Sequence, residues 1–162
     1  MSSTHGEPAL LIAVLIVALL IRRQLRARPV RRTGSLIVPL AFGLLGALAI
    51  AFAVALADEN HHPLTALPVI LLVASLAVAA GFGTARARTV RVWRDARGEI
   101  LRKGTPATTA LWLTSVAAHI GLALWIDHAA GTGVLGTASL YAYLAIGLGT
   151  QNLLIRGRAA AL

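Results

Sequence analysis

Four long apolar stretches most constrain the structures open to this chain. Residues 36–57, 64–82, 106–126 and 134–155 contain no Asp, Glu, Lys or Arg. A hydrocarbon layer of about 30 Å is crossed by roughly 20 residues of apolar helix, so each stretch is long enough to span a membrane. Since 57% of the 162 residues are hydrophobic and only 13% are charged, the composition is unlike that of a water-soluble domain. The sequence predicts an all-α integral membrane protein.

A fifth span is predicted over residues 4–21, near the amino terminus. Its strictly apolar part is short, so the helix includes the polar residues before it, and Arg22 and Arg23 reach back to the membrane surface. A signal peptide carries cations before its apolar stretch, whereas here Glu7 precedes that stretch and arginines follow it. We therefore expect this helix to remain in the mature protein, and residues 1–162 to form a single membrane domain.

With five spans, every cation falls on one side of the membrane. The segments 22–35, 83–105 and 156–162 hold all 15 Lys and Arg residues, and the other side holds Glu7, Asp58, Glu59 and Asp127. Because cytoplasmic loops retain Lys and Arg, the amino terminus is expected outside the plasma membrane and the carboxyl terminus inside. Anionic lipid headgroups beside these arginines account for the net charge of +9, so no nucleic-acid partner is expected.

The second basic loop, ARARTVRVWRDARGEILRKG at residues 85–104, has the pattern of a small β-hairpin. Residues 89–93 alternate β-branched with polar side chains, Asp95-Ala96-Arg97-Gly98 is a turn sequence, and residues 99–103 can return as a second strand. This cytoplasmic hairpin-like loop, between the third and fourth helices, is expected to contact the inner leaflet or a partner protein; the alternative is a plain basic connector. The expected contact residues are Arg86, Arg88, Arg91, Trp93, Arg94, Arg97, Arg102 and Lys103.

The same loop resembles the CcdC-like family of small polytopic bacterial membrane proteins. The likeness rests on Arg-x-Arg-Thr-x-Arg-x-Trp-x-Asp-x-x-Gly from Arg86 to Gly98, on Lys103-Gly104-Thr105 before a span with Trp112, on Arg23-Gln24, and on Asp58-Glu59-Asn60-His61-His62. It covers most of the chain. The family name comes from a cytochrome c biogenesis operon, so the resemblance implies a cell-envelope accessory or scaffold linked to that process, without a defined reaction. Relatives often place an arginine in the fourth span where this sequence has His119.

Histidines and carboxylates on the expected outer side suggest a different function. The candidates for binding a metal or another ligand are His61, His62, His119, His128, Asp58, Glu59 and Asp127. Imidazole is the commonest metal-binding side chain, so an extracytoplasmic protein or enzyme that binds a metal, haem or lipid headgroup is one alternative. No His-x-x-x-His or His-Glu-x-x-His spacing enforces such a site, and outer positions that exclude Lys and Arg favour His in any case. No cofactor is therefore predicted.

A polar seam is predicted between the last two spans. His119 lies roughly 10 Å below the expected outer end of its helix and shares a face with Thr108, Trp112 and Ser115. On the last span Tyr141 and Asn152 form a comparable stripe, so the expected seam residues are Thr108, Ser115, Tyr141 and Asn152. Hydrogen bonding between helices is favoured over a pocket or proton path as the role of this seam.

Other function classes find less support in the sequence. There is no cysteine, which excludes disulfides and covalent haem attachment through cysteine. No phosphate-binding loop or serine elbow is present, so an enzyme is not favoured. The small-residue run Ala47-x-x-x-Ala51-x-x-x-Ala55 is suited to close helix packing, either within the bundle or in a homodimer. A small dimeric transporter is the third alternative, although its spans contain no carboxylate.

Overall fold

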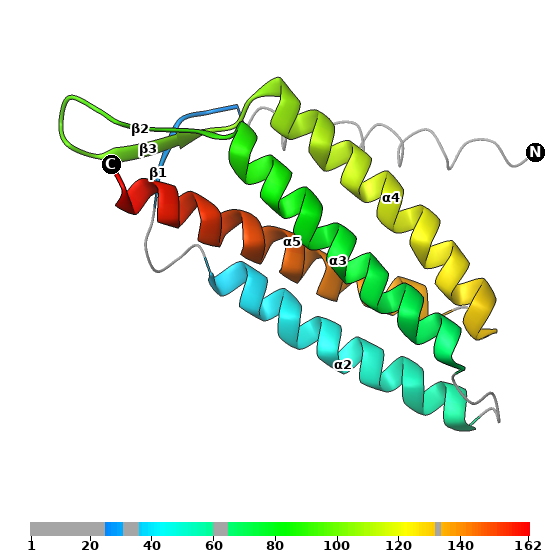
Figure 1. Cartoon of the computed structure of the whole chain (residues 1–162). Coiled ribbons are helices and arrows are strands. Elements are labelled where there is room, and N and C mark those ends of the chain that lie inside the picture. Colours follow the sequence, from blue (N-terminus) through cyan, green and yellow to red (C-terminus); the bar gives the residue numbers. More distant parts are fainter. Residues whose placement is uncertain (1–24, 31–35, 60–64, 132–133) are drawn as a thin grey trace, which may run out of the picture.

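The structure is a computed structural model of the whole chain and describes residues 25–30, 36–59, 65–131 and 134–162. The elements in chain order are β1 (Arg28–Pro29), α2 (Ile37–Glu59), α3 (Ala66–Thr89), β2 (Arg91–Arg94), β3 (Ile100–Lys103), α4 (Pro106–Ala130) and α5 (Leu135–Ala160). Four long helices run alongside one another, and the strands lie at one end of this bundle (Figure 1). The helical architecture expected from the sequence is therefore confirmed for the described residues.

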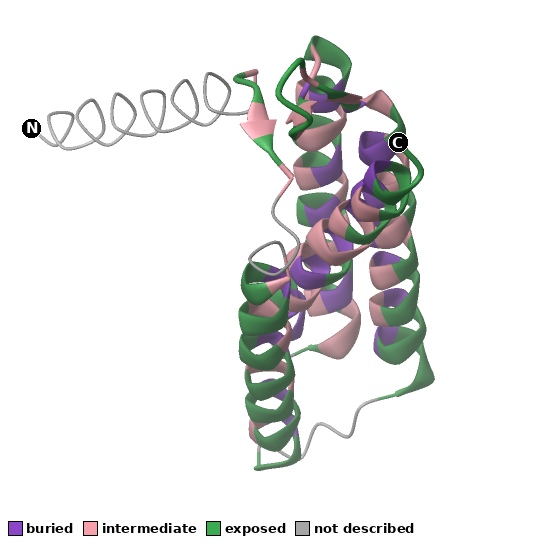
Figure 2. Ribbon diagram, turned by 90° about the vertical axis from the view of Figure 1, so that its left-hand side faces the viewer, coloured by how far each residue is buried: buried purple, intermediate pink, exposed green. Residues whose placement is uncertain are grey.

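Three of these helices, α2, α3 and α4, are long and apolar enough to cross a membrane. Their outward surfaces carry large apolar side chains, and Leu40, Leu48 and Phe52 of α2 are each at least 60% exposed. Figure 2 shows α2 exposed over most of its surface. Water-soluble monomers seldom expose so much apolar area, whereas lipid would cover it. The three helices are thus compatible with a membrane-embedded protein.

The helix α5 corresponds to the span expected at residues 134–155, but it is less apolar and is not one of these three. It contacts each of α2, α3 and α4, and its buried positions include Ser139, Gly147 and Gln151. Polar residues are tolerated in membrane helices where they face protein, so a central helix can be less apolar than its neighbours. The expected span at residues 4–21 lies outside the described residues, and a total of five spans stays a prediction.

Two glycine contacts bring the neighbouring backbones close to α5. A Cβ atom on Gly46 of α2 would lie 2.5 Å from the amide nitrogen of Ala142, and one on Gly83 of α3 would lie 2.5 Å from the carbonyl oxygen of Gly147. No side chain fits at such distances, and small residues are what allows membrane helices to approach this closely. The crossing at Gly83 and Gly147 lies about one helical turn before Arg86, and so sets where that side chain enters the bundle.

The helix α3 continues to Thr89, beyond its expected end at residue 82. Arg86 and Arg88 therefore belong to the helix, and the connector to α4 is shorter than the loop predicted at residues 83–105. The prediction ended the helix early because cations are unfavourable in hydrocarbon, but Arg86 is only 3% exposed and faces protein. The helix α4 likewise extends to Ala130, which places His119 near its middle and deeper than expected.

The predicted hairpin is present. Strand β2 pairs antiparallel with β3, with Arg91 opposite Lys103. Gly98 adopts φ 82° in the turn, a left-handed conformation that suits glycine, and its amide donates to the Asp95 carbonyl at 3.0 Å. The strand β1 adds to the free edge of β3, which gives the order β1-β3-β2. Nothing in the sequence of this two-residue strand predicted it.

The two ends of the bundle differ in charge. The basic strands and the carboxyl-terminal end of α5 lie together at one end (Figure 1). The helix α2 ends in Asp58 and Glu59, and Asp127 lies in the last turn of α4; both helices end at the opposite side of the bundle. This separation agrees with the cation distribution read from the sequence, while the side of the membrane that each end faces stays a prediction.

Candidate functional site

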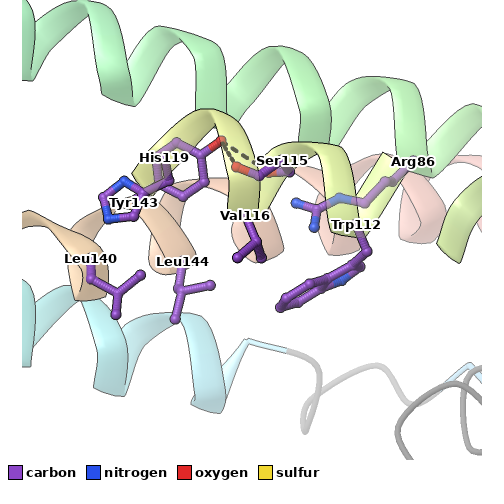
Figure 3. Close-up of a pocket in the computed structure, with 8 residues that line it drawn as sticks. All are labelled: Arg86, Trp112, Ser115, Val116, His119, Leu140, Tyr143 and Leu144. Atoms are coloured by element: carbon purple, nitrogen blue, oxygen red, sulfur yellow. Dashed lines mark hydrogen bonds between the residues drawn. The ribbon is translucent and has the colours of Figure 1, made fainter. Parts of the chain in front are cut away.

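A small cavity lies among α3, α4 and α5. The residues that line it are Arg86, Trp112, Ser115, Val116, His119, Leu140, Tyr143 and Leu144 (Figure 3). The space available to the centre of a water-sized group is about 10 Å³, roughly what a single water molecule requires. Charged, aromatic and aliphatic side chains therefore surround a space for about one small group.

Arg86 is the charged residue of this cavity. Its Cζ lies 5.2 Å from the centroid of the Trp112 ring, within the range of a cation–π interaction. Its Nη2 would be 2.8 Å from a Cβ atom on Gly147, so the glycine makes room for the guanidinium. The Nε of Arg86 has no hydrogen-bond partner among the described residues. Packing thus holds this cation in place and leaves one of its donors unused.

Tyr143, Ser115 and His119 form the polar wall of the cavity. The Tyr143 hydroxyl lies 2.9 Å from the carbonyl oxygen of Ser115 and 2.9 Å from its Oγ. A phenol carries one proton, so it donates to the carbonyl and accepts from the serine hydroxyl. The His119 ring packs on Tyr143 with 4.5 Å between centroids, and its Nδ1 has no partner in the described part of the chain. Thr108, Ser115 and His119 are all buried, which confirms the predicted inward face of α4.

The polar stripe on α5 differs from the predicted one. Tyr141 is 41% exposed and stacks on Phe42 of α2 with 6.2 Å between ring centroids, whereas Tyr143 makes the contact with α4. Asn152 accepts a hydrogen bond from Arg102 Nη1 at 3.2 Å and so connects α5 to strand β3. Because protein surrounds α5 on several sides, spacing alone did not indicate which of its faces meets α4.

The described residues do not bring the predicted outer ligands together. Asp127 Oδ1 instead accepts the amide of Gly136 at 2.6 Å and so binds the start of α5, while His119 lines the cavity. The exposed candidates are Asp58, Glu59 and His128. Within the described ranges, no three potential metal ligands form a group. His61 and His62 lie outside those ranges, and the metal or haem alternative stays a prediction.

A second candidate site lies where the hairpin meets the helix ends. An open hollow of about 750 Å³ is lined by Arg88, Arg91, Lys103 and Arg158, which we call the basic surface, together with Thr89, Val90, Val92, Trp93 and Thr105. None of the described lining residues is acidic. Arg94 and Arg97, also predicted as contact residues, are exposed elsewhere on the hairpin. Four cations therefore surround one hollow without a carboxylate among them.

The hairpin is anchored to the helices. Nη1 of Arg158 donates to the carbonyl oxygens of Ala87 and Val90 at 2.6 and 3.0 Å. Val90 is buried in a small cluster with Ala87 and Ile155, and the hydroxyls of Thr89 and Thr108 lie 2.9 Å apart. These contacts hold the start of the hairpin against the ends of the helices.

Arg102, another predicted contact residue, has a structural role. It lies on β3, is partly buried and donates to Asn152. Burial and the neighbouring cation of Arg28 lower the pKa of Arg102 below the usual value for arginine. Since an arginine stays charged in proteins, its hydrogen bond to α5 helps to hold the strand against the bundle.

Comparisons with family models, curated proteins and solved structures find no match to this chain. The resemblance to the CcdC-like family is thus a prediction from the residues quoted for it.

Proposed function

We propose that this chain is a five-span bacterial plasma-membrane protein, with its amino terminus outside, that acts as a non-enzymatic accessory or scaffold of the cell envelope. In this proposal the basic surface rests on anionic headgroups of the inner leaflet. The observation that carries the proposal is that four cations line one hollow, with no acidic residue among its described lining residues. Lipid phosphates complement such a surface, and Trp93 beside it suits the membrane interface.

The link to cytochrome c biogenesis is part of this proposal and rests on the CcdC-like resemblance. A scaffold for membrane-bound partners needs a defined orientation rather than a reactive centre. Anchoring of the hairpin through Arg158, Thr89 and Val90 supports such a role, because it fixes the basic surface relative to the helices.

Thermal unfolding of the protein in a neutral detergent tests the lipid contact. A ligand that binds the folded state raises the unfolding midpoint, so added phosphatidylglycerol should raise it more than added phosphatidylcholine. The double variant Arg88→Gln/Arg91→Gln should lose most of this difference. Arg94→Gln/Arg97→Gln removes the same amount of charge from positions on the hairpin that do not line the hollow, and should retain the difference.

Two results would contradict the proposal. If phosphatidylglycerol gives no larger shift than phosphatidylcholine, the basic surface does not bind anionic headgroups. If both double variants lose the shift equally, the loop acts through diffuse charge, as a plain basic connector would. The shift caused by phosphatidylglycerol should be smaller at high salt than at low salt, because added salt screens exposed charges.

A further inference from the structure

Arg86 is a buried cation without an acidic neighbour in the cavity. The described acidic residues are Asp58, Glu59, Asp95, Glu99 and Asp127, and none of them lines the space next to Arg86. Two of them, Asp95 and Glu99, lie between β2 and β3 in the hairpin, and the other three lie at the ends of α2 and α4. Removing a charge from water is costly unless an opposite charge pairs with it. The surroundings of Arg86 therefore favour a counter-ion.

The guanidinium of Arg86 points into the cavity. Figure 3 shows the guanidinium extending toward Trp112 and Val116, into the cavity. Trp112 covers it at 5.2 Å, Nη2 lies over Gly147, and Nε is the atom left without a partner. An arginine N–H group donates a charge-assisted hydrogen bond to a carboxylate oxygen.

The rest of the cavity limits the size and chemistry of an occupant. Space for about one water-sized group admits a carboxylate oxygen but no bulky headgroup. Ser115 and Tyr143 already satisfy each other, so they do not compete for the occupant. Val116, Leu140 and Leu144 form the aliphatic side of the cavity, and an apolar chain attached to the acid would lie against it.

We propose that this cavity binds one carboxylate, paired with the guanidinium of Arg86. The acid is either a small free carboxylate or the head of a fatty acid that enters from the membrane, since both offer the same carboxylate oxygen. Binding neutralises the buried cation and uses its free Nε donor. This site is separate from the basic surface, and its occupant reaches Arg86 within the bundle.

Tryptophan fluorescence provides the test, because Trp112 is in contact with Arg86. In detergent-purified Trp93→Phe/Trp125→Phe protein, Trp112 is the remaining tryptophan of the three. We expect its emission to change saturably on titration with lauric acid or sodium formate, and not with methyl laurate or with sodium chloride at matched ionic strength. A much tighter response to lauric acid assigns a fatty-acid source, and equal responses assign a free carboxylate.

Arg86→Gln in this background should weaken the response by at least about tenfold, the usual effect of losing a charged hydrogen-bond partner. Arg97→Gln is the matched control, since Arg97 is an exposed cation in the hairpin and lines neither the cavity nor the hollow, and its response should be unchanged. If Arg86→Gln does not fold, Gly147→Ala serves instead, because its Cβ would displace the guanidinium. Three results would overturn the proposal: an equal response to chloride, no saturable change with any acid, or an undiminished response in Arg86→Gln or, where that variant does not fold, in Gly147→Ala.

Discussion

The hydroxyl of Tyr143 on α5 lies 2.9 Å from both the carbonyl oxygen and the Oγ of Ser115 on α4. Both residues are 2% exposed, so these hydrogen bonds form without competition from water. They join the central helix to α4 beside His119, whose ring packs on Tyr143. The pair thereby fixes one wall of the cavity that contains Arg86.

Tyr143→Phe should lower the stability of the folded protein by about 1 kcal/mol, a typical value for a hydrogen bond between membrane helices. The ring packing remains, so the loss reports the hydroxyl alone. Tyr141→Phe is the matched control two residues earlier on α5, where the side chain is exposed, and should have little effect. Free energies of unfolding measured in detergent check this difference. An equal loss of stability in the two variants would show that the hydrogen bonds between Tyr143 and Ser115 do not stabilise the protein.

Gly46→Ala should separate α2 from α5. The new Cβ would lie 2.5 Å from the backbone nitrogen of Ala142, and a backbone atom cannot move aside as a flexible side chain can. Overpacking of this kind costs about 1–3 kcal/mol, which should lower the unfolding midpoint. Gly121→Ala, where a Cβ meets nothing within 4 Å, should be neutral or stabilising by up to about 1 kcal/mol. A neutral Gly46→Ala would mean that α2 does not pack on α5 as described.

Arg158→Gln should loosen the hairpin from the helix ends. The guanidinium donates to two carbonyl oxygens at Ala87 and Val90, so its loss exposes these acceptors near the end of α3. Because Arg158 is partly solvated, we expect a local cost on the order of 1 kcal/mol. Faster hydrogen exchange of the amides in β2 would reveal it, whereas Arg156→Gln should leave exchange unchanged. Equal exchange in the two variants would contradict the anchoring role.

Opposite membrane sides are expected for the two ends of the bundle. The chain has no cysteine, so single cysteines can be placed without other changes. Glu59→Cys, at the end of α2, should react with an impermeant thiol reagent added to intact cells, and Arg97→Cys in the hairpin should react only after lysis. The reverse pattern would invert the proposed orientation, and labelling of both positions in intact cells would contradict the membrane crossing itself.

Substitutions at His119 separate packing from a polar role. Its ring contacts Tyr143, and its Nδ1 is unpartnered among the described residues. His119→Phe keeps the ring and should therefore preserve stability, while His119→Ala removes it and should cost about 2 kcal/mol or more through the space left behind. Unfolding midpoints of the two variants provide the measurement. A loss in His119→Phe as large as in His119→Ala would indicate that the imidazole nitrogens are needed for folding.

The sequence by itself determined the helical class of the protein and the approximate positions of its four described helices and of the hairpin. Uninterrupted apolar stretches indicated the helices, since backbone groups in lipid must be satisfied within the segment. The turn residues Asp95 to Gly98 indicated the hairpin, because they favour a turn regardless of what surrounds them. The face of α4 that bears Thr108, Ser115 and His119 followed from helical spacing. Each of these features depends on residues close together in the chain.

Only the tertiary structure decided which polar groups meet. The sequence placed Arg86 in a basic loop, because an isolated arginine is unfavourable in a membrane helix; packing against Trp112 and the room left by Gly147 bring it inside. The same holds for Tyr143, which spacing did not distinguish from Tyr141. It holds also for Arg158, which lies 68 residues from the carbonyl it binds at Val90. Contacts between distant segments depend on how the helices pack around α5, and local patterns in a single sequence carry no information about that packing.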